Sequence, residues 1–170
     1  MRSVVITGAS TGIGWATARL LLDRGFRVFG SVRKQADADR LRSEFGVNFT
    51  PLLFDVTDEA AVLAAAREVR TALGGETLAG LVNNAGIAVA GPVLGLSADE
   101  FRRQLDVNVI GPVIAIQAFA PLLGGRPCAE GTARAHRDDQ LGGRQERQSA
   151  DPGLCGFQTC DRGAVGEPAP

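Results

Sequence analysis

The chain has 170 residues, a formal net charge of −1 at pH 7 and 45% hydrophobic residues, which suffices for one domain with a buried core. A charge this close to zero gives no reason to expect nucleic acid or an acidic membrane surface as a partner. The apolar run after Met1 is too short for a signal peptide, and no uninterrupted apolar run approaches the ~20 residues of a membrane span. We therefore expect a cytoplasmic protein without membrane contact.

Segments typical of buried strands alternate with segments typical of helices through residues 1–123. The pattern predicts strands at 4–7, 27–32, 48–54 and 78–82, and helices at 13–24, 37–45, 58–73, from the capping-box sequence at 97–100 onward, and at 107–123. This alternation predicts an α/β fold, a Rossmann-type doubly wound parallel sheet of about four strands. In the first predicted helix, Ile13, Ala16, Leu20 and Leu21 share one helical face.

The chain changes character at Gly124. Residues 124–170 contain 9 Gly, 4 Pro, 4 Gln and 6 Arg and few sizeable apolar residues, so we expect this tail to be disordered and residues 1–123 to form the domain. The only histidine and all three cysteines lie in the tail: Cys128, His136, Cys155 and Cys160. A zinc site is the alternative to incidental thiols, but the paired C-x-x-C spacing is missing, and we predict no metal site.

A glycine-rich segment, Thr7 to Gly14, lies between the first predicted strand and the first predicted helix. Glycines allow the backbone to turn sharply and approach a pyrophosphate, and the free N–H groups at a helix start favour negative charge. The spacing is G-x-x-x-G-x-G rather than the common G-x-G-x-x-G fingerprint. An ordinary glycine turn is the alternative to a dinucleotide-binding loop.

Further polar residues follow the ends of the third and fourth predicted strands. Asp55 ends the third strand, Asn84 ends the fourth, and Asn108 lies in the first turn of the last helix. Ligands of open α/β sheets bind beyond the carboxyl ends of the strands, where these residues fall. Taken singly, each also has a structural explanation, as a helix cap, a turn or a polar residue at a helix start.

The motifs T-G-x-x-x-G-I-G, D-V, N-N-A-G and V-N-V-x-G occur here in the order of the short-chain dehydrogenase/reductase (SDR) family, which the chain resembles from about Ser3 to Leu123. The resemblance implies NAD(P)-dependent hydride transfer on a small carbonyl or alcohol substrate. It also implies that Asn108 is catalytic, supporting a proton-relay water. Cofactor contacts carried over from the family are Gly8, Ser10, Thr11, Gly12, Ile13, Gly14, Asp55, Val56, Asn84, Ala85 and Gly86. Helices similar to 107–123 form dimer contacts in the family, so a homo-oligomer is possible.

The end of the second strand decides between NADP and NAD. A carboxylate there binds the ribose 2′-OH, whereas arginine accommodates a 2′-phosphate. The segment offers Arg33 and Lys34 and no carboxylate. We predict NADP, with NAD the less favoured alternative and solvation of a loop the structural one.

The family's catalytic Ser, Tyr and Lys have no counterpart. The chain contains no tyrosine, and its one lysine, Lys34, lies on the wrong strand. Tyrosine has a pKa near 10 and needs a neighbouring cation to act near neutrality. We therefore predict that the chain as written is catalytically inactive. It is then a damaged reductase, a non-catalytic dinucleotide-binding fragment or an unstable product.

Reading the tail's codons one base later suggests a cause. Across His136 to Gly143 the shifted triplets permit, with the preceding arginine, R-I-V-M-I-S-S-V, which matches the family's fifth strand with its catalytic serine. From Leu154 to Thr159 they permit Y-A-A-S-K, thirteen codons after the second serine, which is the family's spacing. The hypothesis is a one-base insertion, or a two-base loss, near codons 124–126. A naturally divergent tail is the alternative.

Overall fold

The computed structural model describes residues 1–124. The predicted tail beyond Gly124, with its cysteines and histidine, lies outside the described residues, so neither its predicted disorder nor the domain boundary is tested.

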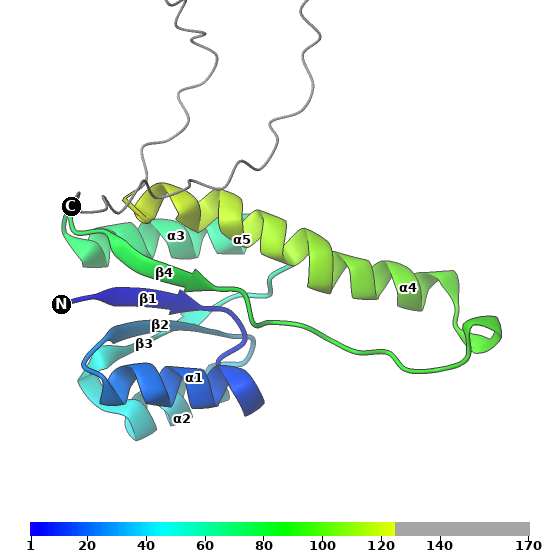
Figure 1. Ribbon diagram of the computed structural model, residues 1–170, viewed down its shortest axis with the longest axis horizontal. Coiled ribbons are helices and arrows are strands. Elements are labelled where there is room, and N and C mark those ends of the chain that lie inside the picture. Colours follow the sequence, from blue (N-terminus) through cyan, green and yellow to red (C-terminus); the bar gives the residue numbers. More distant parts are fainter. Residues whose placement is uncertain (125–170) are drawn as a thin grey trace, which may run out of the picture. The chain divides into compact units, whose positions relative to one another are not determined.

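Four parallel strands form one sheet in the order β3-β2-β1-β4 (Figure 1). The strands are β1 Ser3–Ile6, β2 Arg27–Val32, β3 Phe49–Leu53 and β4 Leu78–Val82. The helices are α1 Gly12–Asp23, α2 Gln35–Phe45, α3 Glu59–Leu73, α4 Ala98–Leu105 and α5 Gly111–Phe119, with a π-helical turn at Asp106–Ile110 and 3₁₀ turns at Gly46–Asn48, Val93–Gly95 and Ala120–Leu122. The predicted Rossmann-type parallel sheet is confirmed.

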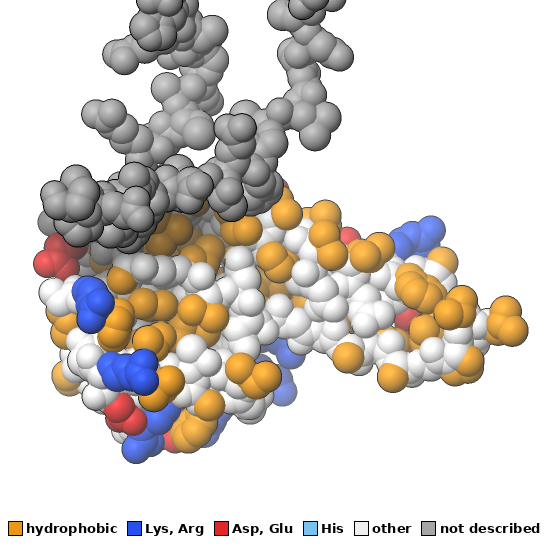
Figure 2. All heavy atoms as spheres, in the orientation of Figure 1, with side chains coloured by type: hydrophobic (Ala, Val, Ile, Leu, Met, Phe, Trp, Pro, Cys, Tyr) orange, Lys and Arg blue, Asp and Glu red, His pale blue; other side chains and the backbone are white. Residues whose placement is uncertain are grey.

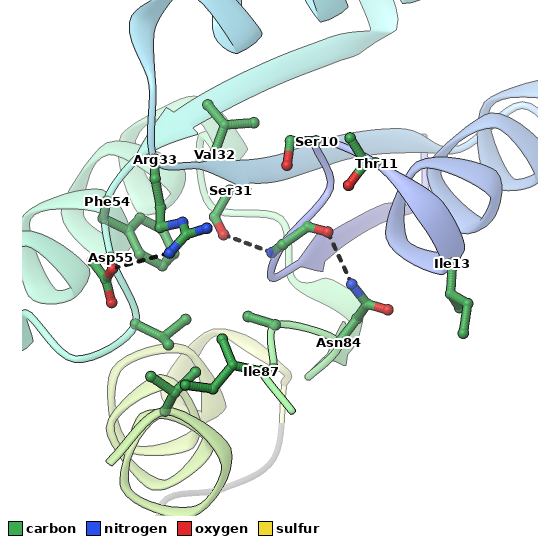
Figure 3. Close-up of a pocket in the computed structure, with 15 residues that line it drawn as sticks. Ser10, Thr11, Ile13, Ser31, Val32, Arg33, Phe54, Asp55, Asn84 and Ile87 are labelled. Carbon is green, nitrogen blue, oxygen red and sulfur yellow. Dashed lines mark hydrogen bonds and ion pairs between the residues drawn. The ribbon is translucent and has the colours of Figure 1, made fainter. Parts of the chain in front are cut away.

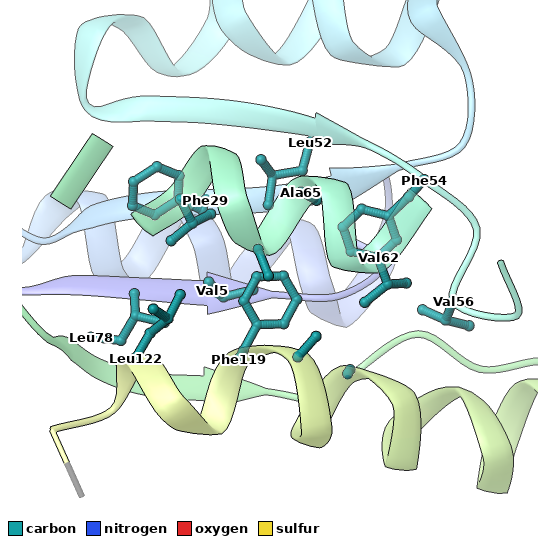
Figure 4. Close-up of a cluster of buried hydrophobic side chains, with 14 of the residues drawn as sticks. Val5, Phe29, Leu52, Phe54, Val56, Val62, Ala65, Leu78, Phe119 and Leu122 are labelled. Carbon is teal, nitrogen blue, oxygen red and sulfur yellow. The ribbon is translucent and has the colours of Figure 1, made fainter. Parts of the chain in front are cut away.

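Helices cover both faces of this sheet, α1 and α2 one face and α3 and α5 the other (Figure 1). Successive residues of a strand point to opposite faces, and β1 supplies both cores in this way. Val5 (0% exposed) belongs to the cluster under α3 and α5, whereas Val4 and Ile6 belong to the cluster under α1 and α2. In the first cluster Phe119 of α5 packs near Phe54, with ring centroids 6.5 Å apart (Figure 4).

Of the four residues that share one face of α1, only Leu21 packs against the core. Ile13 is 80% and Leu20 50% exposed, and Ala16 is exposed as well. The residues of α1 that are buried are Gly14 and Ala18. Gly14 is small because the glycine-rich loop brings the start of α1 against the segments that follow β1 and β4, where a Cβ has no room.

The last two predicted helices form one continuous helix through the π-helical turn. Its N-terminus has the predicted capping box: Ser97 Oγ accepts from the Glu100 N–H (3.2 Å), and the Ser97 N–H donates to Glu100 Oε2 (2.7 Å). This helix, Ala98–Leu122, is long and apolar enough by length and composition to cross a membrane, with a window of mean hydropathy 1.5. Asp106, Asn108 and Gln117 divide its apolar residues into short runs, so the helix contains no long uninterrupted apolar run.

Two apolar surfaces of the described part of the chain are open. Among residues 1–124, β4 pairs only with β1, and Leu81 and Val82 are only half-buried, whereas Val5 and Ile6 of β1 are fully buried. The second surface is the outer face of the long helix, along which hydrophobic side chains gather (Figure 2). Its exposed residues are Phe101, Leu105, Val109, Ile110, Val113 and Ile116.

Candidate functional site

A cavity of about 300 Å³ lies beyond the carboxyl ends of the strands (Figure 3). Most of the predicted site residues line it, namely Gly8, Ser10, Thr11, Ile13, Arg33, Asp55, Val56, Asn84, Ala85 and Gly86. Gly12, Gly14 and Asn108 do not. The cavity therefore brings together predicted residues as far apart in sequence as Gly8 and Gly86, at the edge of the sheet where open α/β folds bind ligands.

The glycine-rich loop is tied to the end of β2. The Gly8 N–H donates to Ser31 Oγ (2.9 Å), and the Ala9 N–H donates to the Ser31 carbonyl (2.9 Å). Gly8 has φ +69°, a left-handed conformation that favours glycine. A Cβ there would also lie 2.9 Å from Ala85 Cα. This turn needs glycine both for its conformation and for its close approach to the segment after β4.

The same loop is tied to the end of β4 by Asn84. Its side-chain amide donates to the carbonyls of Thr7 (3.0 Å) and Gly8 (2.9 Å). Thr7 Oγ1 in turn accepts from the backbone N–H groups of Asn84 and Ala85, both at 3.0 Å. A Cβ on Gly14 would collide with the Gly8 carbonyl and the Asn84 amide. Asn84 and Gly14 thus hold the glycine-rich loop in its conformation, and both hydrogen bonds of the Asn84 amide are made within the protein.

The N-terminus of α1 is left without a side-chain cap. Thr11 is its N-cap residue but makes no side-chain hydrogen bond there, and the first turn contains no acidic residue. By contrast, Asp58 caps α3 and Ser97 caps α4. The first N–H groups of a helix need an acceptor, and the helix dipole makes an anion a favourable one. The arrangement of Ser10, Thr11 and α1 at the cavity suits a phosphate group.

Asp55 is the one carboxylate among the residues that line the cavity. Its Oδ1 accepts from the Thr57 N–H (3.0 Å) and hydroxyl (2.8 Å), while Oδ2 lies 4.0 Å from an Arg33 nitrogen. Burial raises the pKa of this carboxyl, but the Thr57 hydrogen bonds and the charges of Arg33 and Arg103 outweigh it, so the pKa lies below the ordinary 3.8. At neutral pH, Asp55 is therefore an ionised acceptor whose Oδ2 remains available to an amine.

Arg33 is the one cation among the lining residues of this cavity. Its side chain is 69% exposed, and in Figure 3 it extends from the end of β2 toward Asp55. At 4.0 Å, and at this exposure, the ion pair with Asp55 holds it weakly. The guanidinium is thus available to a phosphate placed beyond the end of β2.

Asn108 lies in the π-helical turn and not in the cavity wall. Its Oδ1 accepts from the Ile87 N–H (2.9 Å), and its amide donates to the Ile87 carbonyl (2.8 Å). Such turns recur at functional sites. Here the side chain holds the segment after β4, and Ile87 itself lines the cavity. Both hydrogen bonds commit this side chain to Ile87, and the role of Asn108 in a proton relay stays a prediction.

Five lining residues were not predicted: Ser31, Val32, Phe54, Ile87 and Val107. Ser31 lies in β2, two residues before Arg33, and the alternation of that strand could have placed both side chains on the same side. Phe54 and Val107 each adjoin a predicted residue. Ile87 likewise adjoins the predicted Gly86, and its hydrogen bonds with Asn108 hold it in place.

The sequence profile described as short chain dehydrogenase matches residues 2–130. The chain belongs to the short-chain dehydrogenase family. Among its relatives, the chain is 43% identical over 124 residues to an NADPH-dependent 3-dehydrocapnine reductase of Ornithobacterium rhinotracheale, covering 73% of this chain and 44% of the relative. It is 40% identical to human retinol dehydrogenase 5, covering 71% of this chain and 38% of the relative.

Solved structures give the same result. The NADPH-bound carbonyl reductase from chicken fatty liver is similar with a TM-score of 0.66 and 34% identity, covering 72% of this chain and 48% of that one. A 3-oxoacyl-[acyl-carrier protein] reductase from Brucella melitensis has a TM-score of 0.62 and 33% identity, covering 71% of this chain and 46% of that one. The chain thus spans less than half the length of these relatives, and the part it matches is the Rossmann-type nucleotide-binding half of an NAD(P)-dependent oxidoreductase family.

Proposed function

We propose that this chain binds NADP(H) in the cavity at the ends of the strands, and that it does so without turning over a carbonyl or alcohol substrate. The observation that carries the cofactor assignment is the end of β2, where Arg33 reaches the cavity and no carboxylate is present. Arginine at this place accommodates a 2′-phosphate, whereas an acidic residue would bind the 2′-OH of NAD. The uncapped start of α1 would receive the pyrophosphate and Asp55 the adenine amine.

The absence of turnover rests on the sequence. The family's chemistry uses a tyrosine assisted by a lysine, but the chain has no tyrosine and its one lysine is Lys34, next to Arg33. When bound, the dinucleotide supplies the hydride. Residues 1–124 would bind and orient it, but no group of the expected kind supplies the proton.

Dinucleotide titrations of the purified chain test this proposal. We expect NADPH to bind about tenfold more tightly than NADH, since a charged hydrogen bond contributes about 1.5–3 kcal/mol and Arg33 is largely exposed. Arg33→Gln is expected to abolish this preference. Arg24→Gln, an exposed charge at the far end of α1, is the matched control. Equal affinity for both dinucleotides in the wild type would refute the assignment of NADP, and reduction of any carbonyl substrate would refute the claim of inactivity.

The gene's intact product is the second candidate function, an NADP-dependent reductase or alcohol dehydrogenase. The open apolar edge of β4 and the exposed face of the long helix favour it, because such surfaces in a complete fold are covered. The one-base-shifted reading of the tail supplies the missing catalytic residues and a further apolar strand, R-I-V-M-I-S-S-V. That strand has the composition of a neighbour for β4.

Resequencing codons 115–170 and expressing a frame-corrected gene test this candidate. An open shifted frame with Y-x-x-x-K, together with NADPH-dependent carbonyl reduction by the corrected protein, would support it. Stop codons in the shifted frame would rule it out and leave the non-catalytic fragment. Aggregation of the 170-residue chain alongside a soluble corrected protein would indicate that the written chain is the unstable product.

A further inference from the structure

Arg40 of α2 links that helix to the glycine-rich loop. Its Nη2 donates to the Ser10 carbonyl at 2.7 Å, across 30 positions of sequence. The same guanidinium contacts Asp37 Oδ1 at 3.3 Å through Nη2 and Glu44 Oε2 at 3.3 Å through Nη1. Arg40 does not line the cavity, but Ser10 does.

Asp37 and Glu44 lie one helical turn before and one turn after Arg40, so their carboxylates fix the orientation of the guanidinium that contacts the loop. They also offset its charge, which leaves little attraction for a further phosphate. The planar fork of arginine donates in fixed directions. Its contact with Ser10 is therefore a geometric constraint more than a source of positive potential.

This hydrogen bond constrains the Ser10–Thr11 peptide, which directly precedes the uncapped first turn of α1. The peptide between Ser10 and Thr11 is planar and trans, so its C=O and N–H point in opposite directions. Holding the Ser10 carbonyl on Arg40 turns the Thr11 N–H away from Arg40. Ser10 and Thr11 both line the cavity, and Thr11 is the residue before the first turn of α1.

We propose that Arg40 is a positioning residue that orients the Ser10–Thr11 peptide for the pyrophosphate of the bound dinucleotide. The proposal rests on the dinucleotide binding proposed above. It separates two arginines by function. Arg33 would select the 2′-phosphate, whereas Arg40 would serve the pyrophosphate, which NADPH and NADH share.

The test compares NADPH and NADH affinities for the full 170-residue chain and its Arg40→Gln variant. We expect both affinities to fall by the same factor, about tenfold, because the Ser10–Thr11 peptide is then no longer held in place and must be ordered when the dinucleotide binds. Arg40→Lys can still donate to Ser10 but cannot span both carboxylates, so we expect an intermediate loss. Arg42→Gln, an exposed arginine of the same helix, is the control and should change neither affinity. Thermal unfolding of the ligand-free variants is measured in parallel.

Each outcome decides the proposal. Parallel losses with an unfolding temperature equal to that of the Arg42 control support it. A selective loss of NADPH would make Arg40 a 2′-phosphate ligand, and unchanged affinities would leave it no role, so either overturns it. A drop in unfolding temperature beyond the control, with affinities lost in proportion, overturns it in favour of a stabilising role. If the wild type binds neither dinucleotide, the proposed function itself fails, and that result is visible before any variant is made.

Discussion

Substitution of Gly14 by alanine is the sharpest test of how the loop is built. A Cβ at this position would meet the carbonyl of Gly8 and the side-chain amide of Asn84. Neither can move freely, because the Asn84 amide bonds to the Thr7 and Gly8 carbonyls at 3.0 and 2.9 Å. The new methyl group must therefore displace the loop from the segment after β4 or push α1 outward.

The expected cost follows from three contributions. Overpacking a tight contact costs about 1–3 kcal/mol, and loss of the two Asn84 hydrogen bonds costs about 1 kcal/mol each. Alanine gains about 1 kcal/mol over glycine in a helix. The net loss in free energy of unfolding is about 2–4 kcal/mol, a large part of the about 5–15 kcal/mol of a typical domain.

Urea unfolding of the purified chain measures this loss, with Gly25→Ala as the matched control. Gly25 has φ +75° and no atom within 4 Å of an added Cβ, so that variant carries only the strain of a left-handed residue, about 1–2 kcal/mol. Gly14→Ala should be the more destabilising of the two and should also weaken NADPH binding. If its free energy of unfolding matches or exceeds that of Gly25→Ala, the packing argument is refuted.

Three further predictions use the same measurement. Gly111→Ala places a Cβ 2.8 Å from Val56 Cγ2, so we expect a net loss of about 1–2 kcal/mol despite the better helix propensity, and a gain in stability would contradict the contact. Asn108→Ala removes both hydrogen bonds to the backbone after β4 and should cost about 1–2 kcal/mol and speed exchange of the Ile87 amide, an effect visible by NMR. Because the pKa of Asp55 is lowered on folding, its ionised form contributes stability above the ordinary value of 3.8 that is lost as pH falls through the lowered pKa. Asp55→Asn should therefore be less stable than the wild type at pH 7, and the difference should shrink as the pH falls below 3.8; a constant difference would argue against this linkage.

Much of the fold could be predicted from the sequence, because strand and helix signals agree locally with the final structure. The β-branched run before Gly8 predicted β1, and Ser97 with Glu100 predicted the start of α4 by their spacing alone. The buried residues of α1 could not be predicted from helical periodicity, because Gly14 is small for a reason that lies outside the helix: a Cβ there would meet the Gly8 carbonyl and the Asn84 amide. Helical periodicity predicts which apolar side chains share a face of the helix. It does not predict where a neighbouring loop comes so close that only a small residue fits.

The sequence predicted those residues of the candidate site whose side chains are charged or lie in a recognisable motif. Asp55 and Arg33 could be assigned from charge and position along their strands. The π-helical turn around Asn108 could not, since an inserted residue in a helix leaves no periodic signal in a single sequence. Arg40 was missed for a related reason: its contact with Ser10 joins residues 30 positions apart, and on α2 it looks like an ordinary solvated charge paired with its helical neighbours.

The glycine-rich segment Thr7 to Gly14 has two explanations, tight packing of the loop and binding of the cofactor. Gly8 and Gly14 are required by packing, because each lies where a Cβ would meet the segment after β4. Their presence would follow even if nothing bound. The uncapped, acid-free start of α1 has no such packing reason. Asp58 caps α3 and Ser97 caps α4, and α2, which also lacks a side-chain cap, carries Asp37 in its first turn. The argument for an anion at this place therefore depends on α1 more than on its glycines, and placing an acidic residue at Thr11 should remove dinucleotide binding while stabilising the helix start.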